Sequence, residues 1–198
     1  MKMDNQQSVF RHNRRSIRLK GYDYSQQGLY FITVCCQDRA CLFGDISNGE
    51  MVLNDAGKMI STEWLALKKR FPNIELHEYI VMPNHFHGIL EIVGASLVGV
   101  HNNDYPYVNP NDNNTNGQPQ GIAPTKKTVG DMMDAFKSIT SVEYIRGVKT
   151  HNWKRFNKKL WQRNYWEHII RNDKSLDRIA AYIINNPQRW SADKLKNA

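Results

Sequence analysis

Hydrophobic and polar positions divide the chain into short strand and helix segments. Runs of β-branched and aromatic residues predict strands over 28–36, 75–93 and 160–171. The Asn48-Gly49 pair predicts a short hairpin or an edge element across 45–53. Apolar residues near helical spacing predict helices over roughly 55–70, 128–146 and 173–185. We expect Asp173 or Ser175 to cap the last of these helices.

The order of these elements predicts an α+β fold. The helices lie between strands of what we expect to be one sheet, and that sheet is too small for a doubly wound arrangement. We therefore expect a single domain with a ferredoxin-like antiparallel sheet packed with helices. The domain should span residues 21–190, between a basic N-terminal arm at 1–20 and a C-terminal tail at 191–198. Within it, residues 95–125 are rich in Asn, Gly and Pro and should form a flexible insertion.

The charge balance adds a class of partner. The 198 residues include 27 Lys and Arg against 19 Asp and Glu, which gives a formal net charge of +8 and favours a polyanion such as nucleic acid. No apolar run approaches the roughly 20 residues that span a bilayer. The first residues lack the apolar core of a secretory signal, and three clustered cysteines make no disulfide framework. We expect a cytoplasmic protein without membrane contacts.

Positive charge gathers in two segments that could contact DNA phosphates. In the arm, the expected contacts are Arg11, Arg14, Arg15, Arg18 and Lys20. In the basic segment 149–159, they are Lys154, Arg155, Lys158 and Lys159. Trp153 and Phe156 are interleaved with the second set. These two aromatics could stack on bases, or they could simply anchor a solvated basic loop.

A pair of histidines gives the clearest sign of chemistry. His85 and His87 lie one strand repeat apart, so both should point to one face of the strand while Phe86 points to the other. Two imidazoles in that arrangement can clamp a metal ion. Such pairs also occur as surface histidines or as hydrogen-bonded core histidines, so the pair alone leaves these interpretations open.

A second candidate pair lies in the last helix. Tyr182 and Asn186 are four residues apart and should be neighbours on one helix face. Taken singly, Tyr182 fits a half-buried aromatic, and Asn186 fits a helix C-cap ahead of Pro187. Together with the two histidines, they could form a metal site with a nucleophile beside it. Two imidazoles and an amide oxygen suit Mg²⁺ or Mn²⁺, and a tyrosine one turn away can attack phosphorus.

Three ordered motifs carry a resemblance to a known family. Residues 80–87 read IVMPNHFH, residues 160–171 read LWQRNYWEHIIR, and residues 182–187 read YIINNP. In this order they resemble the single-tyrosine HUH transposases, and most closely the branch associated with repetitive extragenic palindromes, the REP-associated tyrosine transposases. The resemblance covers roughly residues 20–190 apart from the insertion, which is longer than we expect between the two halves.

The resemblance implies a function and a set of roles. It implies a transposase-like endonuclease and strand-transferase that recognises hairpins in single-stranded DNA and cleaves through a 5′-phosphotyrosine, with Mg²⁺ or Mn²⁺ as cofactor. Tyr182 would be the nucleophile, and the metal ligands would be His85, His87 and Asn186. The second motif would supply DNA contacts at Trp161 and Arg163 and support for the site at Gln162, Tyr165, His168 and Arg171. For His168, a structural hydrogen-bonding role is an equal alternative. The protein would act as a monomer or homodimer.

Two other functions fit parts of the pattern. A domesticated hairpin-binding protein would bind stem-loops without cutting them, but it would have no use for all four site residues. A metallohydrolase of small phosphoesters would use the histidines and leave Tyr182 with a structural role. The net charge and the basic segment favour a long polyanion over a small substrate.

Overall fold

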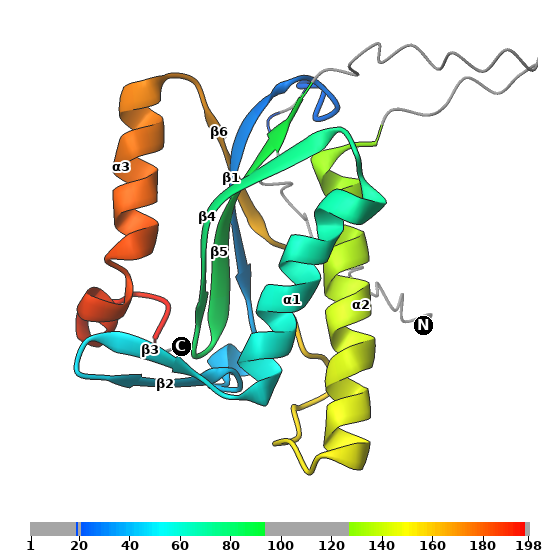
Figure 1. The fold of residues 1–198 in the computed structure, drawn as a ribbon, viewed down its shortest axis with the longest axis vertical. Helices are drawn as coiled ribbons and strands as arrows, with labels where there is room; N and C mark the ends of the chain where they lie inside the picture. The colour runs from blue at the N-terminus through cyan, green and yellow to red at the C-terminus, as the bar shows by residue number, and fades with distance from the viewer. Residues whose placement is uncertain (1–18, 20, 94–126, 197–198) are drawn as a thin grey trace, which may run out of the picture.

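Four antiparallel strands form the sheet that carries the candidate site (Figure 1). The structure is a computed structural model that describes Leu19, residues 21–93 and residues 127–196. The strands are β1 (Gly28–Cys35), β4 (Ile74–Met82), β5 (His85–Ile92) and β6 (Trp166–Ile170), in the spatial order β4-β5-β1-β6. Every neighbouring pair is antiparallel. The predicted ferredoxin-like α+β fold is confirmed.

Helices cover both faces of this sheet (Figure 1). Helices α1 (Asp55–Arg70) and α2 (Val129–Thr150) pack against each other on one face, and α3 (Asp173–Ile184) lies on the other. The hairpin of β2 (Gly44–Ser47) and β3 (Glu50–Leu53) precedes α1. Its turn residues Asn48 and Gly49 have φ angles of 53° and 78°, as a tight Asn-Gly hairpin turn requires.

Side-chain alternation along β1 separates the two faces of the sheet. Tyr30, Ile32 and Val34 point into the larger core beneath α1 and α2, where they belong to one cluster with Trp64. Phe31 points to the α3 side, where a smaller apolar cluster forms. Because most apolar side chains gather under α1 and α2, the α3 face has room for buried polar groups.

The start of α3 differs from the prediction. The Asn172 side chain accepts a hydrogen bond from the Ser175 backbone N–H (2.9 Å) and caps the helix, so neither predicted cap is correct. Asp173 lies within the first turn, where its negative carboxylate interacts favourably with the positive end of the helix dipole. Helix α2 also runs to Thr150 rather than ending near Arg146, so the basic segment starts inside a helix.

The predicted strand over 75–93 is two strands. β4 and β5 form a hairpin that turns at Pro83 and Asn84. Pro83 has no N–H for a strand ladder. Its carbonyl oxygen accepts hydrogen bonds from the backbone N–H groups of Leu42 and Phe43 (2.8 and 3.1 Å), outside the sheet. Periodicity missed this turn because apolar residues continue on both sides of it.

The predicted strand over 160–171 is shorter than expected. β6 begins at Trp166, and Trp161 makes only an isolated bridge to Cys36. Lys137 Nζ donates hydrogen bonds to the carbonyl oxygens of Gln162 and Arg163 (2.9 and 2.7 Å). These carbonyl groups therefore bind α2 instead of a neighbouring strand.

Residues 191–196, the described part of the predicted C-terminal tail, pack back on the domain. A 3₁₀ helix, η2 (Pro187–Ala192), follows α3, and the next residues return to the β4–β5 turn. There Asn84 Nδ2 donates to the carbonyl oxygens of Leu195 and Lys196 (2.8 and 3.2 Å). The predicted insertion and the arm, apart from Leu19, lie outside the described residues. No helix within the described ranges is long and apolar enough to cross a membrane.

Replacement of Gly57 by alanine should test how closely α1 packs against the backbone at Phe43, directly before β2. A Cβ at this position would lie 2.2 Å from the Phe43 carbonyl oxygen, so the backbone must shift. We expect Gly57→Ala to lower the free energy of unfolding by about 1–3 kcal/mol, although alanine is the better helix former. Urea denaturation measures this, with the exposed Thr62→Ala in the same helix as control. A Gly57→Ala protein as stable as the wild type would contradict this packing.

Candidate active site

His85 and His87 lie on β5 with both side chains on the α3 side of the sheet. Phe86 between them points the other way and packs against Trp64, with ring centroids 4.7 Å apart. The two imidazole centroids are 4.6 Å apart, and the residues are 0% and 1% exposed. The prediction that the histidines share one face is confirmed.

Hydrogen bonds to neighbouring polar side chains orient both imidazoles. Asn84 Nδ2 donates to three backbone carbonyl oxygens, so Asn84 Oδ1 is the atom that faces His85 Nδ1, at 2.8 Å. His85 Nδ1 must then carry the proton and donate it, which leaves a lone pair on Nε2. His87 Nδ1 lies 2.8 Å from the Thr33 hydroxyl, which can donate or accept this hydrogen bond.

Burial keeps both imidazoles neutral. Desolvation lowers the pKa of His85 to about 2, with smaller contributions from His87 and Arg39. Desolvation also lowers the pKa of His87 to about 3. Both histidines are therefore uncharged at neutral pH, which is the form in which imidazole binds metal ions.

Tyr182 projects from α3 toward the histidines. Its hydroxyl oxygen lies 3.4 Å from His87 Nε2, and the two ring centroids are 5.3 Å apart. Burial and the Asp193 carboxylate raise the pKa of Tyr182 above its ordinary value of 10, against opposing effects of Asn186 and Arg189. The phenol is therefore protonated at neutral pH and needs an added positive charge to become a better nucleophile.

Asn186 lies one turn after Tyr182, as the spacing predicts. α3 ends at Ile184, but Asn186 keeps helical φ and ψ angles of −59° and −42°, and its N–H donates to the Ile183 carbonyl oxygen (3.2 Å). The residue is 2% exposed, and its Oδ1 has no hydrogen-bond partner among the described residues.

Asp193 belongs to the site although the sequence did not indicate it. Its Oδ2 lies 3.7 Å from His85 Nε2, and its side chain is 8% exposed. The distance would suit an ion pair, but His85 is neutral, so the contact is between two acceptors. Within the described residues His85 Nε2, Asn186 Oδ1 and Asp193 Oδ2 are all buried without a hydrogen-bond partner. Such lone pairs are costly to bury unless a cation or donor binds them.

The residues present fit a divalent cation. Two imidazole nitrogens with amide and carboxylate oxygens form a mixed donor set that suits Mn²⁺, and the oxygens also suit Mg²⁺. In the described part of the chain, no three His, Cys, Asp or Glu side chains are grouped as a metal site. The set therefore depends on the Asn186 amide oxygen, with Asp193 as a candidate ligand that the sequence missed.

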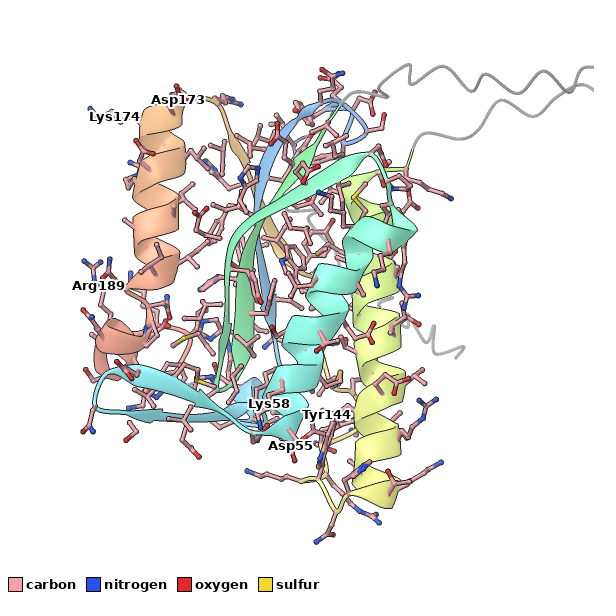
Figure 2. All side chains as sticks on the ribbon, in the orientation of Figure 1. Asp55, Lys58, Tyr144, Asp173, Lys174 and Arg189 are labelled. Carbon is pink, nitrogen blue, oxygen red and sulfur yellow. The ribbon has the colours of Figure 1, made fainter. Side chains whose placement is uncertain are left out.

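A cavity of about 520 Å³ opens beside these groups. Tyr182 lines it together with Phe31 and Trp166 from the sheet, and with Arg189 and Lys194 from the segment after α3. Figure 2 shows Arg189 at this end of α3 and Asp173 and Lys174 at the other.

The second motif divides between the two faces of the sheet. Trp161 is 3% exposed in the core under α1 and α2, where its Nε1 donates to the Thr140 hydroxyl (2.8 Å). Tyr165 is 8% exposed in the same core. Both side chains pack on the face of the sheet opposite the histidines. The predicted DNA contact at Trp161 and the predicted site support at Tyr165 are therefore wrong.

The remaining residues of this motif lie nearer the surface. The backbone N–H of Gln162 donates a hydrogen bond to the Cys35 carbonyl oxygen (2.9 Å). Arg163 is exposed. His168 and Arg171 are exposed and line a separate cavity of about 430 Å³ at the N-terminal end of α3. The structure therefore does not bring His168 and Arg171 to the cavity beside Tyr182.

The basic segment lies at the C-terminal end of α2, and its aromatics act as anchors. Trp153 and Phe156 both pack against Tyr144, with ring centroids 5.4 and 5.6 Å away. The four predicted cations of the segment are exposed: Lys154, Arg155, Lys158 and Lys159. The five predicted contacts of the arm lie outside the described residues: Arg11, Arg14, Arg15, Arg18 and Lys20.

Sequence reasoning missed Asn84, Asp193 and Trp166. Asn84 stands directly before His85 and could have been noticed as a polar residue between two apolar runs. Trp166 lies inside the second motif, where an alternating strand pattern separates it from Tyr165. Asp193 has no comparable signal, because it lies far from the histidines in sequence and after the predicted end of the domain.

No family model matches the chain. An uncharacterised protein of Haemophilus influenzae (strain ATCC 51907 / DSM 11121 / KW20 / Rd) is 41% identical over 187 residues, which are 93% of each chain. The chain belongs to the family of this protein.

A solved structure has a fold similar to that of this chain. The REP-associated tyrosine transposase bound to a REP hairpin matches 91% of this chain and 77% of its own, with a TM-score of 0.53 and 19% sequence identity. The chain thus shares the fold of the REP-associated tyrosine transposases, as the three motifs predicted.

The two tryptophans of the second motif should differ in their effect on stability. Trp161→Ala leaves a cavity in the core and removes the hydrogen bond from Trp161 Nε1 to the Thr140 hydroxyl, so we expect the free energy of unfolding to fall by about 3–5 kcal/mol. Trp166→Ala is the matched control, because this side chain is 61% exposed, and it should change stability by less than about 1 kcal/mol. Similar losses in the two variants, measured by denaturant unfolding, would contradict the assignment of Trp161 to the core.

The neutral histidines should make the metal-free protein sensitive to acid. Below pH 6.5 the unfolded chain binds protons at His85 and His87. The folded chain does not bind them, because the folded pKa values are about 2 and 3. Stability should therefore fall with falling pH, by up to about 1.4 kcal/mol per pH unit for each histidine. Urea unfolding in EDTA between pH 5 and 6.5 measures this slope. His87→Gln should reduce it, and an unchanged slope would argue against a buried neutral His87.

Proposed function

We propose that the protein is a transposase-like single-strand DNA endonuclease and strand-transferase that cleaves through Tyr182 with a divalent cation. One observation carries the proposal. The Tyr182 hydroxyl lies 3.4 Å from His87 Nε2 in a site where His85, Asn186 and Asp193 each bury an unpartnered lone pair. A tyrosine with only a structural role would not account for this set of acceptors around it.

Tyr182 supports one specific reaction. Its phenol oxygen forms a bond to phosphorus while the bond from phosphorus to the 3′ oxygen breaks. The phenol loses its proton, and the departing 3′ oxygen gains one and becomes a free hydroxyl. The DNA 5′ phosphate stays on Tyr182, and a 3′ hydroxyl can attack the phosphotyrosine in the reverse step. This transesterification keeps the energy of the broken linkage, so strands can be cut and rejoined without ATP.

The chain's own groups prepare this step. His85, His87 and Asn186 would hold Mg²⁺ or Mn²⁺, with Asp193 as a further ligand. The cation, when bound, supplies positive charge that polarises the phosphodiester and stabilises the charge that develops on it. Asn84 and Thr33 orient the imidazoles, and α3 presents Tyr182 to the same site.

Single-stranded hairpin DNA is the substrate that we propose. The net charge of +8 favours a polyanion. The transposase of similar fold is bound to a REP hairpin. Exposed cations of the basic segment and of the second motif offer phosphate contacts. The cavity beside Tyr182 is also lined by Trp166 of the edge strand β6.

Covalent adduct formation tests the proposal. We expect a denaturation-resistant protein–DNA band when the protein is incubated with Mn²⁺ or Mg²⁺ and single-stranded oligonucleotides that carry the palindromes flanking its own gene. A label at the 3′ end of the DNA should stay with the protein, and a label at the 5′ end should leave on the fragment with the free 3′ hydroxyl. EDTA and Tyr182→Phe should each abolish the band.

The control is Tyr79→Phe, a half-buried tyrosine on the opposite face of the sheet, which should form the adduct normally. An adduct that persists in Tyr182→Phe would exclude Tyr182 as the nucleophile. Binding to the hairpin in a native gel without any adduct would instead support a hairpin-binding protein that does not cut.

A further inference from the structure

Trp166 exposes a large aromatic surface beside the candidate active site. It is 61% exposed on the edge strand β6, and the other large exposed hydrophobic side chains in the described ranges are aliphatic. Single exposed apolar side chains are common on protein surfaces. The position of Trp166 is therefore what makes it informative.

Trp166 lies in the same row of the sheet as the histidine site. It is paired with Thr33 on β1, and Thr33 is paired with His87 on β5. Directly paired residues share a face of the sheet, so Trp166 projects to the α3 side. Two strand spacings of about 4.8 Å put its backbone roughly 10 Å from that of His87. A stacked nucleobase there would leave its phosphate within reach of the site.

The cavity next to Trp166 has an apolar floor. Phe31 lines it and is already packed against His87 and Tyr182, with ring centroids 5.3 and 6.1 Å away. The volume of about 520 Å³ lies in the range of small-ligand sites and is large enough for a nucleotide. Phe31 thus holds the floor in place, while the exposed indole of Trp166 is available to a ligand.

Positive charge lies in the same cavity. Arg189 and Lys194 line it from the segment after α3, and both are exposed (Figure 2 labels Arg189). An aromatic surface and two cations around one cavity are complementary to a base and its flanking phosphates.

We propose that Trp166 is a base-stacking residue that holds one nucleobase of single-stranded DNA beside the phosphate that Tyr182 attacks, an inference that rests on the proposed function. Arg189 and Lys194 then contact the flanking phosphates. Stacking requires a π-face rather than particular hydrogen-bonding groups, so this subsite accepts any base. Trp166 is thus a positioning residue: it sets the register of the strand and does not touch the reacting atoms.

Equilibrium binding tests the subsite without cleavage. The probe is a short fluorescein-labelled oligothymidylate in EDTA, and the protein carries Tyr182→Phe in every variant. By fluorescence anisotropy, Trp166→Ala should weaken binding about 5- to 100-fold, and Trp166→Phe should recover most of the loss because it keeps a ring. Val142→Ala, 54% exposed on α2 in the opposite layer, is the matched control and should bind as its parent does. Equal affinity of Trp166→Ala and its parent would overturn the proposal.

Photo-cross-linking gives a readout that a purely structural role of Trp166 would not produce. An oligothymidylate with 5-iododeoxyuridine substitutions is irradiated on the protein, and the modified peptide is sequenced by mass spectrometry. We expect the cross-link on Trp166, its transfer to the new ring in Trp166→Phe, and its loss in Trp166→Ala. Cross-links confined to other residues, such as Trp153 in the basic segment, would overturn the proposal.

Failure of this inference can be told apart from failure of the proposed function. If the wild type forms the covalent adduct and Trp166→Ala forms it with the same yield at every DNA concentration, the stacking subsite is refuted and the nuclease function stands. If the wild type forms no adduct but Trp166-dependent binding and cross-linking are present, the subsite stands and the cleavage function is refuted.

Discussion

The buried amide of Asn84 holds the site together. Its Nδ2 donates to the carbonyl oxygens of Arg39, Leu195 and Lys196, and its Oδ1 accepts from His85 Nδ1. These bonds join the segment after β1, the β4–β5 turn and residues 195–196 at one point. Loss of the Asn84 side chain would remove all four bonds and leave His85 Nδ1, which is buried, without its partner. The same side chain therefore orients a candidate ligand and fixes the segment that carries Asp193.

The two faces of the sheet differ in composition: one carries most of the apolar core, and the other buries the polar site residues. Aromatic and aliphatic side chains crowd under α1 and α2 and provide most of the core. The α3 face has a smaller apolar cluster and can bury His85, His87 and Asn186 beside it. Burial in this apolar setting keeps the imidazoles neutral. The protonation state of the two histidines thus depends on the packing around them as much as on their identity.

The second motif shows how far a sequence pattern can be interpreted. Trp161 and Trp166 lie within a few residues of each other, yet one is in the core and the other is 61% exposed. The resemblance applies to the motif as a unit, so it predicts DNA contact or site support for its residues together. The backbone between the two leaves the sheet, because Lys137 binds the carbonyl groups of Gln162 and Arg163, and β6 starts only at Trp166. Which side chain reaches the surface depends on that tertiary contact.

The sequence by itself determined the elements with strong local signals. The period-two pattern around Phe86 predicted that His85 and His87 share a face, and the four-residue spacing placed Asn186 one turn after Tyr182, because strand and helix geometry are local properties. The tertiary structure alone decided that these two pairs meet at one site, where α3 packs against β5. It also decided that Asp193 returns to His85. Those outcomes depend on contacts between residues far apart in the chain, which no local pattern records.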